Sequence, residues 1–126
     1  MFITKIFSFE AAHHLPNHQG ACHNTHGHSY KLEITLDGWT NGNPASNEYG
    51  MIMDFGKLKS IVQKEIIDRF DHQDLNSIFP NPTAENMVDE IADILSEKID
   101  RGNDGPILFS VKLWETSTSY AEWRAE

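Results

Sequence analysis

Hydrophobic and polar residues alternate along residues 27–37, and this alternation predicts a strand. One face of the strand, extended back by one residue, would carry His26, His28, Tyr30, Leu32, Ile34 and Leu36. The other face would carry Gly27, Ser29, Lys31, Glu33, Thr35 and Asp37. One apolar and one polar face are typical of a half-buried antiparallel strand. The two histidines therefore begin the inward-facing row and point at the protein interior or at a pocket.

Two further strands are predicted in the first half of the chain. The first covers residues 2–10, where Phe7 and Phe9 share a face. A connection rich in Asn, Gly, Ser and Pro follows the second strand at residues 38–50, and this composition suits a long hairpin. We expect the chain to return from it as a short strand at residues 51–53.

The C-terminal part of the chain also alternates. Residues 107–115 predict a strand. One of its faces would carry Ile107, Phe109, Val111 and Leu113. The next residue on that face is Glu115, so a carboxylate extends an apolar row. A terminal strand is expected around residues 120–123.

Two segments between these strands have helical periodicity. Asp54 is suited to cap a helix that ends near Phe70, and Thr83 is suited to cap a second helix that Gly102 ends. The apolar positions of the first helix, at three- and four-residue spacing, are Phe55, Leu58, Ile61, Val62, Ile66 and Phe70. The second helix carries Met87, Val88, Ile91, Ile94, Leu95 and Ile99.

This order of elements predicts an α+β fold, with helices on one face of an antiparallel sheet. The length of 126 residues and a 39% hydrophobic content suit one domain, residues 1–126. A small open sheet leaves edges that must be covered or paired. We therefore expect a homo-oligomer in which other subunits pair with these edges.

Composition limits the partners. A net charge of −9 with only 10 Lys and Arg argues against a nucleic-acid partner, which would need a basic face. No apolar run approaches the roughly 20 residues that cross a bilayer, so we expect no membrane partner. The first residues lack signal-peptide features, and one cysteine cannot form an intrachain disulfide. These features favour a cytoplasmic protein.

Residues 12–28 hold six of the seven histidines and the only cysteine. On a strand, His26 and His28 share a face, so one metal ion can reach both. Zinc in catalytic sites often has three protein ligands and an open position. The third ligand would be one of four other histidines of this segment, His13, His14, His18 or His23. A hairpin between the first two strands favours His13 or His14.

Cys22 leaves two interpretations open. A closed structural site of three histidines and Cys22 is one, because four-ligand zinc sites commonly include cysteine. In the other, Cys22 stays unligated near a metal-bound substrate, and its thiolate acts as a base. Two further features are weak evidence of a functional site when taken alone: the Asp71-His72 pair and Glu115 at a strand end.

Six motifs taken together resemble the family of 6-pyruvoyl-tetrahydropterin and 6-carboxy-tetrahydropterin synthases. They are Phe9-Glu10-Ala11-Ala12-His13, Cys22-x-x-x-His26-Gly27-His28, Gly50-Met51-Ile52-Met53-Asp54-Phe55, Asp71-His72-x-x-Leu75-Asn76, Pro82-Thr83-x-Glu85 and Glu115-Thr116. They occur in the family's order, and the resemblance covers nearly the whole chain.

The resemblance implies a role for each matching residue. The implied zinc ligands are His13, His26 and His28. Cys22 would be the catalytic base, and His72 would assist proton transfer while Asp71 orients its ring. Glu115 would anchor the pterin, with a contact from Thr83. It also implies a T-fold, in which sheets from several subunits join into a barrel with active sites between subunits. A hexamer is the assembly that the family favours.

The implied substrate is 7,8-dihydroneopterin triphosphate. Zinc would bind its side-chain oxygens and acidify the adjacent C–H as a Lewis acid, and Cys22 would remove the proton. Triphosphate would be lost. In the carboxy branch, used in queuosine biosynthesis, carbon–carbon cleavage would release acetaldehyde and give 6-carboxy-5,6,7,8-tetrahydropterin.

The three-residue spacer between Cys22 and His26 resembles the carboxy branch, because the pyruvoyl branch usually has a longer one. The sequence from Asp71 to Asn76 also favours the carboxy branch. The alternatives are a 6-pyruvoyl-tetrahydropterin synthase and a non-catalytic zinc-binding or pterin-binding module. The pattern leaves His14 and His23 unassigned, either as competing ligands or as phosphate contacts. Candidates for binding the triphosphate are Lys5, Lys31, Lys57 and Arg69.

Overall fold

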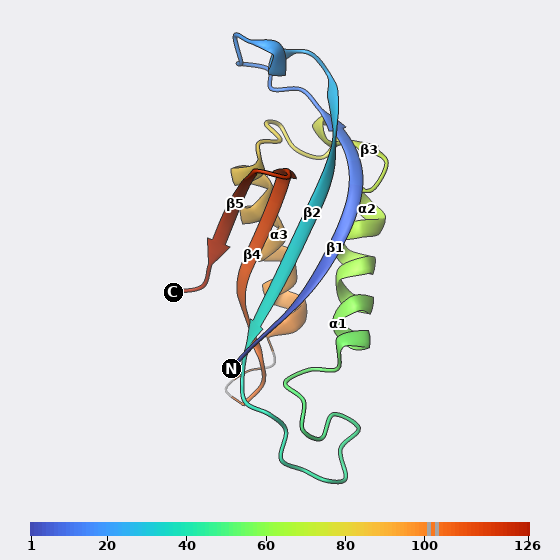
Figure 1. The fold of residues 1–126 in the computed structure, drawn as a ribbon, viewed down its shortest axis with the longest axis vertical. Coiled ribbons are helices and arrows are strands. Elements are labelled where there is room, and N and C mark those ends of the chain that lie inside the picture. Colours follow the sequence, from blue (N-terminus) through green and yellow to red (C-terminus); the bar gives the residue numbers. More distant parts are fainter. Residues whose placement is uncertain (101, 103) are drawn as a thin grey trace.

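The computed structural model describes residues 1–100, 102 and 104–126, and it contains one five-stranded sheet (Figure 1). The strands are β1 (Phe2–His13), β2 (His26–Asp37), β3 (Gln73–Asp74), β4 (Ile107–Thr116) and β5 (Ser119–Arg124). Their order in the sheet is β3-β1-β2-β4-β5, and every pair except the parallel β1–β3 pair is antiparallel. The strands predicted near both ends of the chain are thus confirmed, whereas β3 was not predicted.

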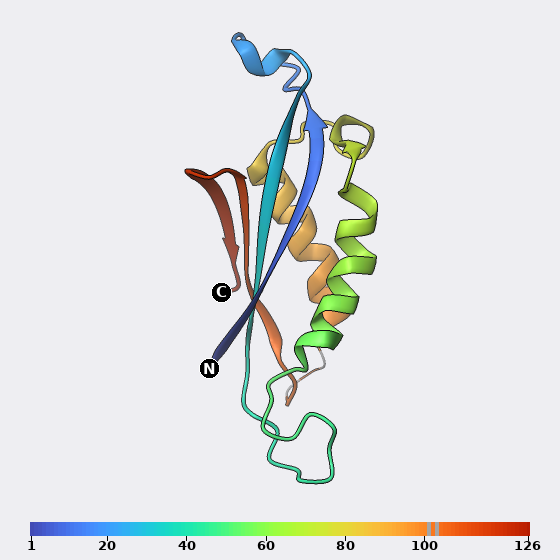
Figure 2. The same ribbon diagram turned by 45° about the vertical axis from the view of Figure 1, so that its right-hand side comes forward.

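Helices cover one face of this sheet (Figure 2). The predicted first helix consists of α1 (Phe55–Val62), a π-helical turn (Gln63–Ile67) and α2 (Asp68–Phe70), and the second is α3 (Ala84–Ile99). Both predicted N-caps are confirmed, because Asp54 Oδ1 accepts a hydrogen bond from the N–H of Gly56 and Thr83 Oγ1 accepts one from the N–H of Asn86. Helix α3 ends at Ile99, before the predicted terminator Gly102.

The core lies between the helices and the sheet. The inward-facing row of β2 is confirmed, because Leu32, Ile34 and Leu36 are fully buried. From the helices, Phe70 and Ile91 are also fully buried in the same cluster. Each such side chain contributes about 1.5–3 kcal/mol relative to an exposed position. This core fixes the sheet on which the histidines lie.

The predicted strand at residues 51–53 is wrong. Ile52 and Met53 are adjacent and both buried, whereas neighbouring residues of a strand point to opposite faces. The backbone is held by a different pairing, in which the N–H of Asn41 donates to the carbonyl of Met51 and the N–H of Gly50 donates to the carbonyl of Asn41. The segment therefore closes a loop and adds the buried side chain of Met53 to the core cluster.

The predicted face of β4 is wrong in its first half. Opposite the step from Thr35 to Leu36 the register shifts, so that Phe109 is an extra residue in β4. As a result Leu108, not Ile107, is buried, while Phe109 packs on Phe2 with ring centroids 4.5 Å apart. Beyond this bulge the predicted row is correct, since Val111 and Leu113 are fully buried.

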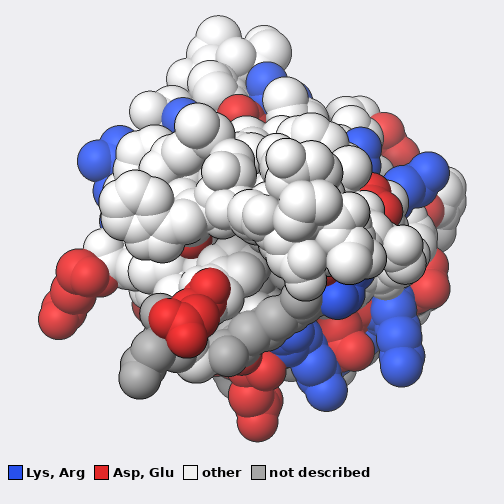
Figure 3. All heavy atoms as spheres, turned by 90° about the horizontal axis from the view of Figure 1, so that it is seen from below, with Lys and Arg blue, Asp and Glu red and all other residues white. Residues whose placement is uncertain are grey.

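The two ends of the sheet differ in character. The end opposite the histidines carries the 38–53 connection, and seen from below its surface is mostly uncharged (Figure 3). Exposed hydrophobic residues in this part of the chain are Met1, Phe2, Trp39, Tyr49, Met51 and Phe55. Among the described residues, no helix is long and apolar enough to cross a membrane.

Candidate metal centre

Three histidines meet where β1 ends and β2 begins. His13 is the last residue of β1 and pairs directly with His26, the first residue of β2. The ring centroids of these two histidines and His28 lie 4.7–4.9 Å from one another, and the ligand nitrogens all lie within 4.8 Å. The structure thus brings together the three ligands that the resemblance implies. Of the two candidates that hairpin geometry favoured for the third ligand, it is His13 that lies in this group.

Backbone carbonyls fix which nitrogen of two rings carries the proton. The Nδ1 atom of His13 lies 2.8 Å from the carbonyl oxygen of Pro82, and that of His26 lies 2.7 Å from the carbonyl oxygen of Asn24. A carbonyl can only accept, so each Nδ1 must carry the hydrogen. The Nε2 atoms, 3.1 Å apart, then face each other with lone pairs, an arrangement that a cation between them would stabilise.

His28 supplies the third nitrogen. Its Nε2 atom is buried and has no hydrogen-bond partner among the described residues, although it lies 3.3 Å from Oε1 of Glu115. Burial lowers the pKa of His28, Glu115 opposes this shift, and His13 and His26 add to it. A neutral imidazole is the form that binds metal. Three convergent imidazole nitrogens, one otherwise unpaired, fit a zinc ion with an open fourth position.

Glu115 lies at a second bulge, beside this cluster. Trp114 pairs with Tyr120 and Thr116 pairs with Ser119, so Glu115 has no partner of its own on β5. Its carboxylate, predicted to anchor a pterin, lies against His28. The side chain also lines two cavities, one of about 590 Å³ beside α3 and one of about 480 Å³ beside β2.

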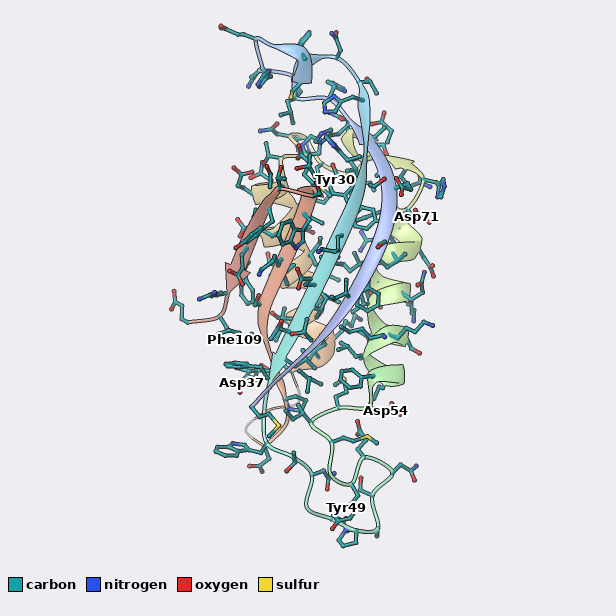
Figure 4. All side chains as sticks on the ribbon, in the orientation of Figure 1. Tyr30, Asp37, Tyr49, Asp54, Asp71 and Phe109 are labelled. Carbon is teal, nitrogen blue, oxygen red and sulfur yellow. The ribbon has the colours of Figure 1, made fainter. Side chains whose placement is uncertain are left out.

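Tyr30 is a site residue that the sequence did not single out for chemistry. Its ring is buried, and its hydroxyl lies 3.4 Å from Nδ1 of His13 (Figure 4). Burial and the Glu115 charge raise the pKa of the phenol, so Tyr30 stays neutral at physiological pH. The signal was present, because Tyr30 follows His26 and His28 in the same inward-facing row.

Asp71 lies beside β1 (Figure 4), and His72, the next residue, is hydrogen-bonded to Glu10 of β1. Asp71 Oδ1 accepts a hydrogen bond of 2.9 Å from the N–H of Glu10 and lies 3.0 Å from Nδ1 of His72. The N–H of Glu10 and, secondarily, His72 hold the pKa of Asp71 below its usual value. His72 has a φ of 60° and donates its N–H to the carbonyl of Glu10, so this turn is fixed against β1. Its side chain is 78% exposed and lies outside the three-histidine group.

Cys22 also lies outside that group. It belongs to a short turn, Ala21–His23, in the connection that extends beyond the sheet (Figure 1). Its carbonyl accepts a hydrogen bond of 2.7 Å from the N–H of Leu15, and its side chain is half-buried. Among the described residues, the group that could hold a metal ion therefore consists of histidines alone, which favours the open site over the closed one.

His14 and Thr83 have structural contacts. The Asn76 side chain accepts from the N–H of His14 at 2.8 Å and donates to its carbonyl at 3.0 Å, as a neighbouring strand would. The His14 ring lies 3.4 Å from the same amide, away from the ligand group. Thr83 caps α3 directly after Pro82, the residue whose carbonyl holds His13.

A family profile described as 6-pyruvoyl tetrahydropterin synthase matches residues 2–126. The chain belongs to the 6-pyruvoyl tetrahydropterin synthase family. Curated members with similar sequences include the 6-carboxy-5,6,7,8-tetrahydropterin synthase of Haemophilus influenzae, 34% identical with 97% of both chains covered. Another is the enzyme of that name from Synechocystis, 37% identical with 96% of this chain and 91% of the relative covered.

Solved structures of the family share the fold. The Caenorhabditis elegans 6-pyruvoyl tetrahydropterin synthase superposes with a TM-score of 0.82, 24% identity and coverage of 100% of this chain and 96% of that chain. The Plasmodium falciparum protein of the same name gives a TM-score of 0.73, 16% identity and coverage of 99% and 97%. The predicted α+β T-fold, with two helices on one face of the sheet, is thereby confirmed.

Proposed function

We propose that this family member converts 7,8-dihydroneopterin triphosphate and one water molecule, which supplies the second carboxylate oxygen, to 6-carboxy-5,6,7,8-tetrahydropterin, with release of acetaldehyde and triphosphate. The reaction would use zinc and serve queuosine biosynthesis. The observation that carries the proposal is the group of three imidazole nitrogens, within 4.8 Å of one another, in a chain 34–37% identical to relatives named for this product. Zinc supplies Lewis-acid chemistry that acidifies the C–H to be broken.

The proton-transfer roles fall to residues outside the histidine group. Cys22 removes the substrate proton as a thiolate, and His72 passes protons while Asp71 orients its ring. The contact of 3.0 Å between Asp71 Oδ1 and His72 Nδ1 supports the second assignment. It leaves the Nε2 atom of His72 free to face a substrate.

The pterin ring belongs, in this proposal, beside Glu115 in the larger cavity of about 590 Å³. Its walls include the carboxylates of Glu85, Asp89 and Glu122, which suit the amino and ring N–H groups of a pterin. Thr83 caps the helix next to this cavity and would add a contact through its hydroxyl oxygen.

Other copies of the chain would complete the active site. Within the described sheet, β3 pairs with β1 only at Ala11 and Ala12, and β5 pairs only with β4. Residues 2–9 of β1 and the outer edge of β5 therefore present unpaired backbone groups. Pairing of these edges between subunits would close a barrel, and a homohexamer of this chain is the assembly we propose.

A second candidate is the 6-pyruvoyl tetrahydropterin synthase reaction. A relative named 6-pyruvoyl tetrahydrobiopterin synthase, from Dictyostelium discoideum, is 30% identical with 85% of this chain and 76% of the relative covered. The two reactions differ in whether a carbon–carbon bond breaks. The short spacer between Cys22 and His26 favours the carboxy product.

Mass spectrometry of the products of zinc-loaded protein with 7,8-dihydroneopterin triphosphate separates the candidates. A carboxy-tetrahydropterin with acetaldehyde is the expected result. A pyruvoyl product would replace the first proposal with the second. Unchanged substrate, with zinc bound at one ion per chain, would contradict both and indicate a binding module.

A further inference from the structure

The proposed substrate carries a triphosphate, yet the chain has a net charge of −9. Such a chain can hold a polyanion only where a local positive group meets it. Of four cavities of about 240–590 Å³ in the described chain, only one has a lysine or arginine in its wall. That residue is Lys31, and the same cavity of about 480 Å³ also reaches His28.

The cavity exists because two strands separate. Pairing between β2 and β4 runs from Asp37 and Ile107 up to Lys31 and Trp114, where the register ends. Above that pair the cavity lies between residues 27–29 of β2 and residues 115–117 of β4 and its turn. Its walls therefore connect the open face of the sheet with the contact between His28 and Glu115.

The Lys31 ammonium is held in place without a carboxylate partner. Its Nζ atom lies 4.4 Å from the ring centroid of Trp114, and Trp114 donates its indole N–H to Glu33. This hydrogen bond fixes the indole plane on which the ammonium rests. Within the described residues Lys31 forms no ion pair, so its charge is available to an anion.

Charge separates the two cavities that meet at Glu115. The larger one has three further carboxylates, from Glu85, Asp89 and Glu122, and would repel phosphates. The smaller one combines Lys31 with the hydroxyl-bearing residues Thr116 and Ser117. A ligand that spans both would place an amine-rich ring on one side and an anion on the other.

We infer that the cavity between β2 and β4 is a polyphosphate subsite in which Lys31 binds the phosphate arm of the substrate. The inference rests on the proposed function, because the pterin in the larger cavity directs the arm toward Lys31. The assignment selects one of the four basic candidates that the sequence offered. Lys112 provides a matched comparison, because it also lies over an aromatic ring, with its Nζ 4.6 Å from the Tyr120 ring centroid. Unlike Lys31, it lines none of the four cavities.

Equilibrium binding of two unreactive, fully oxidised ligands to zinc-loaded protein tests this subsite without turnover. The ligands are neopterin triphosphate and neopterin. Lys31→Ala should weaken binding of the triphosphate about 10- to 100-fold, the usual range for a hydrogen bond between charged groups. Binding of neopterin should change by less than about twofold. Lys31→Arg should restore most of the lost affinity, and Lys112→Ala should leave both affinities unchanged.

The outcomes separate this inference from the proposed function. Equal losses for both ligands in Lys31→Ala, or equal effects of Lys31→Ala and Lys112→Ala, would overturn the subsite while wild-type pterin binding still supported the function. Wild-type protein that binds neither ligand would overturn the proposed function and the subsite together.

Discussion

The histidine group and the proposed proton-transfer residues are built in opposite ways. The three histidines lie on paired strands, and backbone carbonyls hold the Nδ1 atoms of His13 and His26. Cys22 and His72 lie on connections, one half-buried and the other exposed. A metal site needs fixed ligand geometry before the ion arrives, whereas groups that move protons can be completed by substrate or another subunit. One chain therefore brings the three histidines together but does not gather the proposed proton-transfer residues around them.

The largest effect is expected on zinc affinity, from the removal of one of the proposed metal ligands. His28→Ala should lower zinc affinity by more than about 100-fold, because changes in the surroundings of ligands alone cost 10- to 100-fold. Metal content by mass spectrometry after dialysis against a weak chelator measures it. His14→Ala is the matched control, since that ring lies at Asn76, and it should keep its zinc. Equal zinc loss in both variants would break the distinction between the histidine group and its neighbours.

Cys22→Ala should separate binding from turnover. We expect zinc to be retained and the rate to fall about 100- to 10,000-fold, the usual contribution of a positioned base. Zinc analysis and steady-state kinetics on the same sample give both quantities. Loss of zinc in this variant would instead favour the closed structural site, in which Cys22 is the fourth ligand beside three histidines.

Asn76→Ala should have an intermediate effect on stability. It removes two hydrogen bonds to the backbone of His14, next to His13, and should cost about 1–3 kcal/mol in free energy of unfolding. Urea denaturation measures this cost. Asn86→Ala, which removes one side-chain bond to the carbonyl of Asn81, should cost about 1 kcal/mol. If the Asn86 variant were the less stable of the two, Asn76 would not support the end of β1.

The smallest expected effect is the loss of stability at low pH as the Asp71 carboxylate becomes protonated. The Glu10 N–H holds the pKa of Asp71 below its usual value, so the carboxylate stays ionised as pH falls below the unfolded value of about 3.9. Its contribution to stability is present above that value and is lost as pH falls through the folded pKa. Carboxyl NMR titration should give a midpoint below about 3.9. A higher midpoint would mean that the turn at His72 is not fixed in solution.

The sequence predicted the parts of the fold that repeat and missed the parts where a repeat breaks. The row from Tyr30 to Leu36 is regular, so its period alone identified the buried face. Phe109 lies at a bulge, where one extra residue shifts the faces without any change in the apolar pattern. Glu115 also lies at a bulge, but it continues the predicted row and lies against His28. Ile52 and Met53 were predicted as part of a strand because they are apolar, but they are apolar because they are buried in a loop.

The residues of the candidate site were also predictable only where a regular pattern was present. His26 and His28 could be paired from spacing within one strand, but the partner from β1 depended on register, which local periodicity does not supply. The short strand β3, which fixes Asp71 and His72 beside Glu10, has only two residues and no pattern to detect. Those two residues were found through the resemblance to a known family.

The bulge at Glu115 sets how the chain can change in length. Removing one residue between Trp114 and Ser119 would change the pairing of β4 with β5 beside the carboxylate that contacts His28. Insertions and deletions there should be eliminated by selection, whereas the 38–50 connection, at the far end of the sheet, can lengthen or shorten freely. Among related chains, variation in length should therefore gather at one end of the molecule and spare the other.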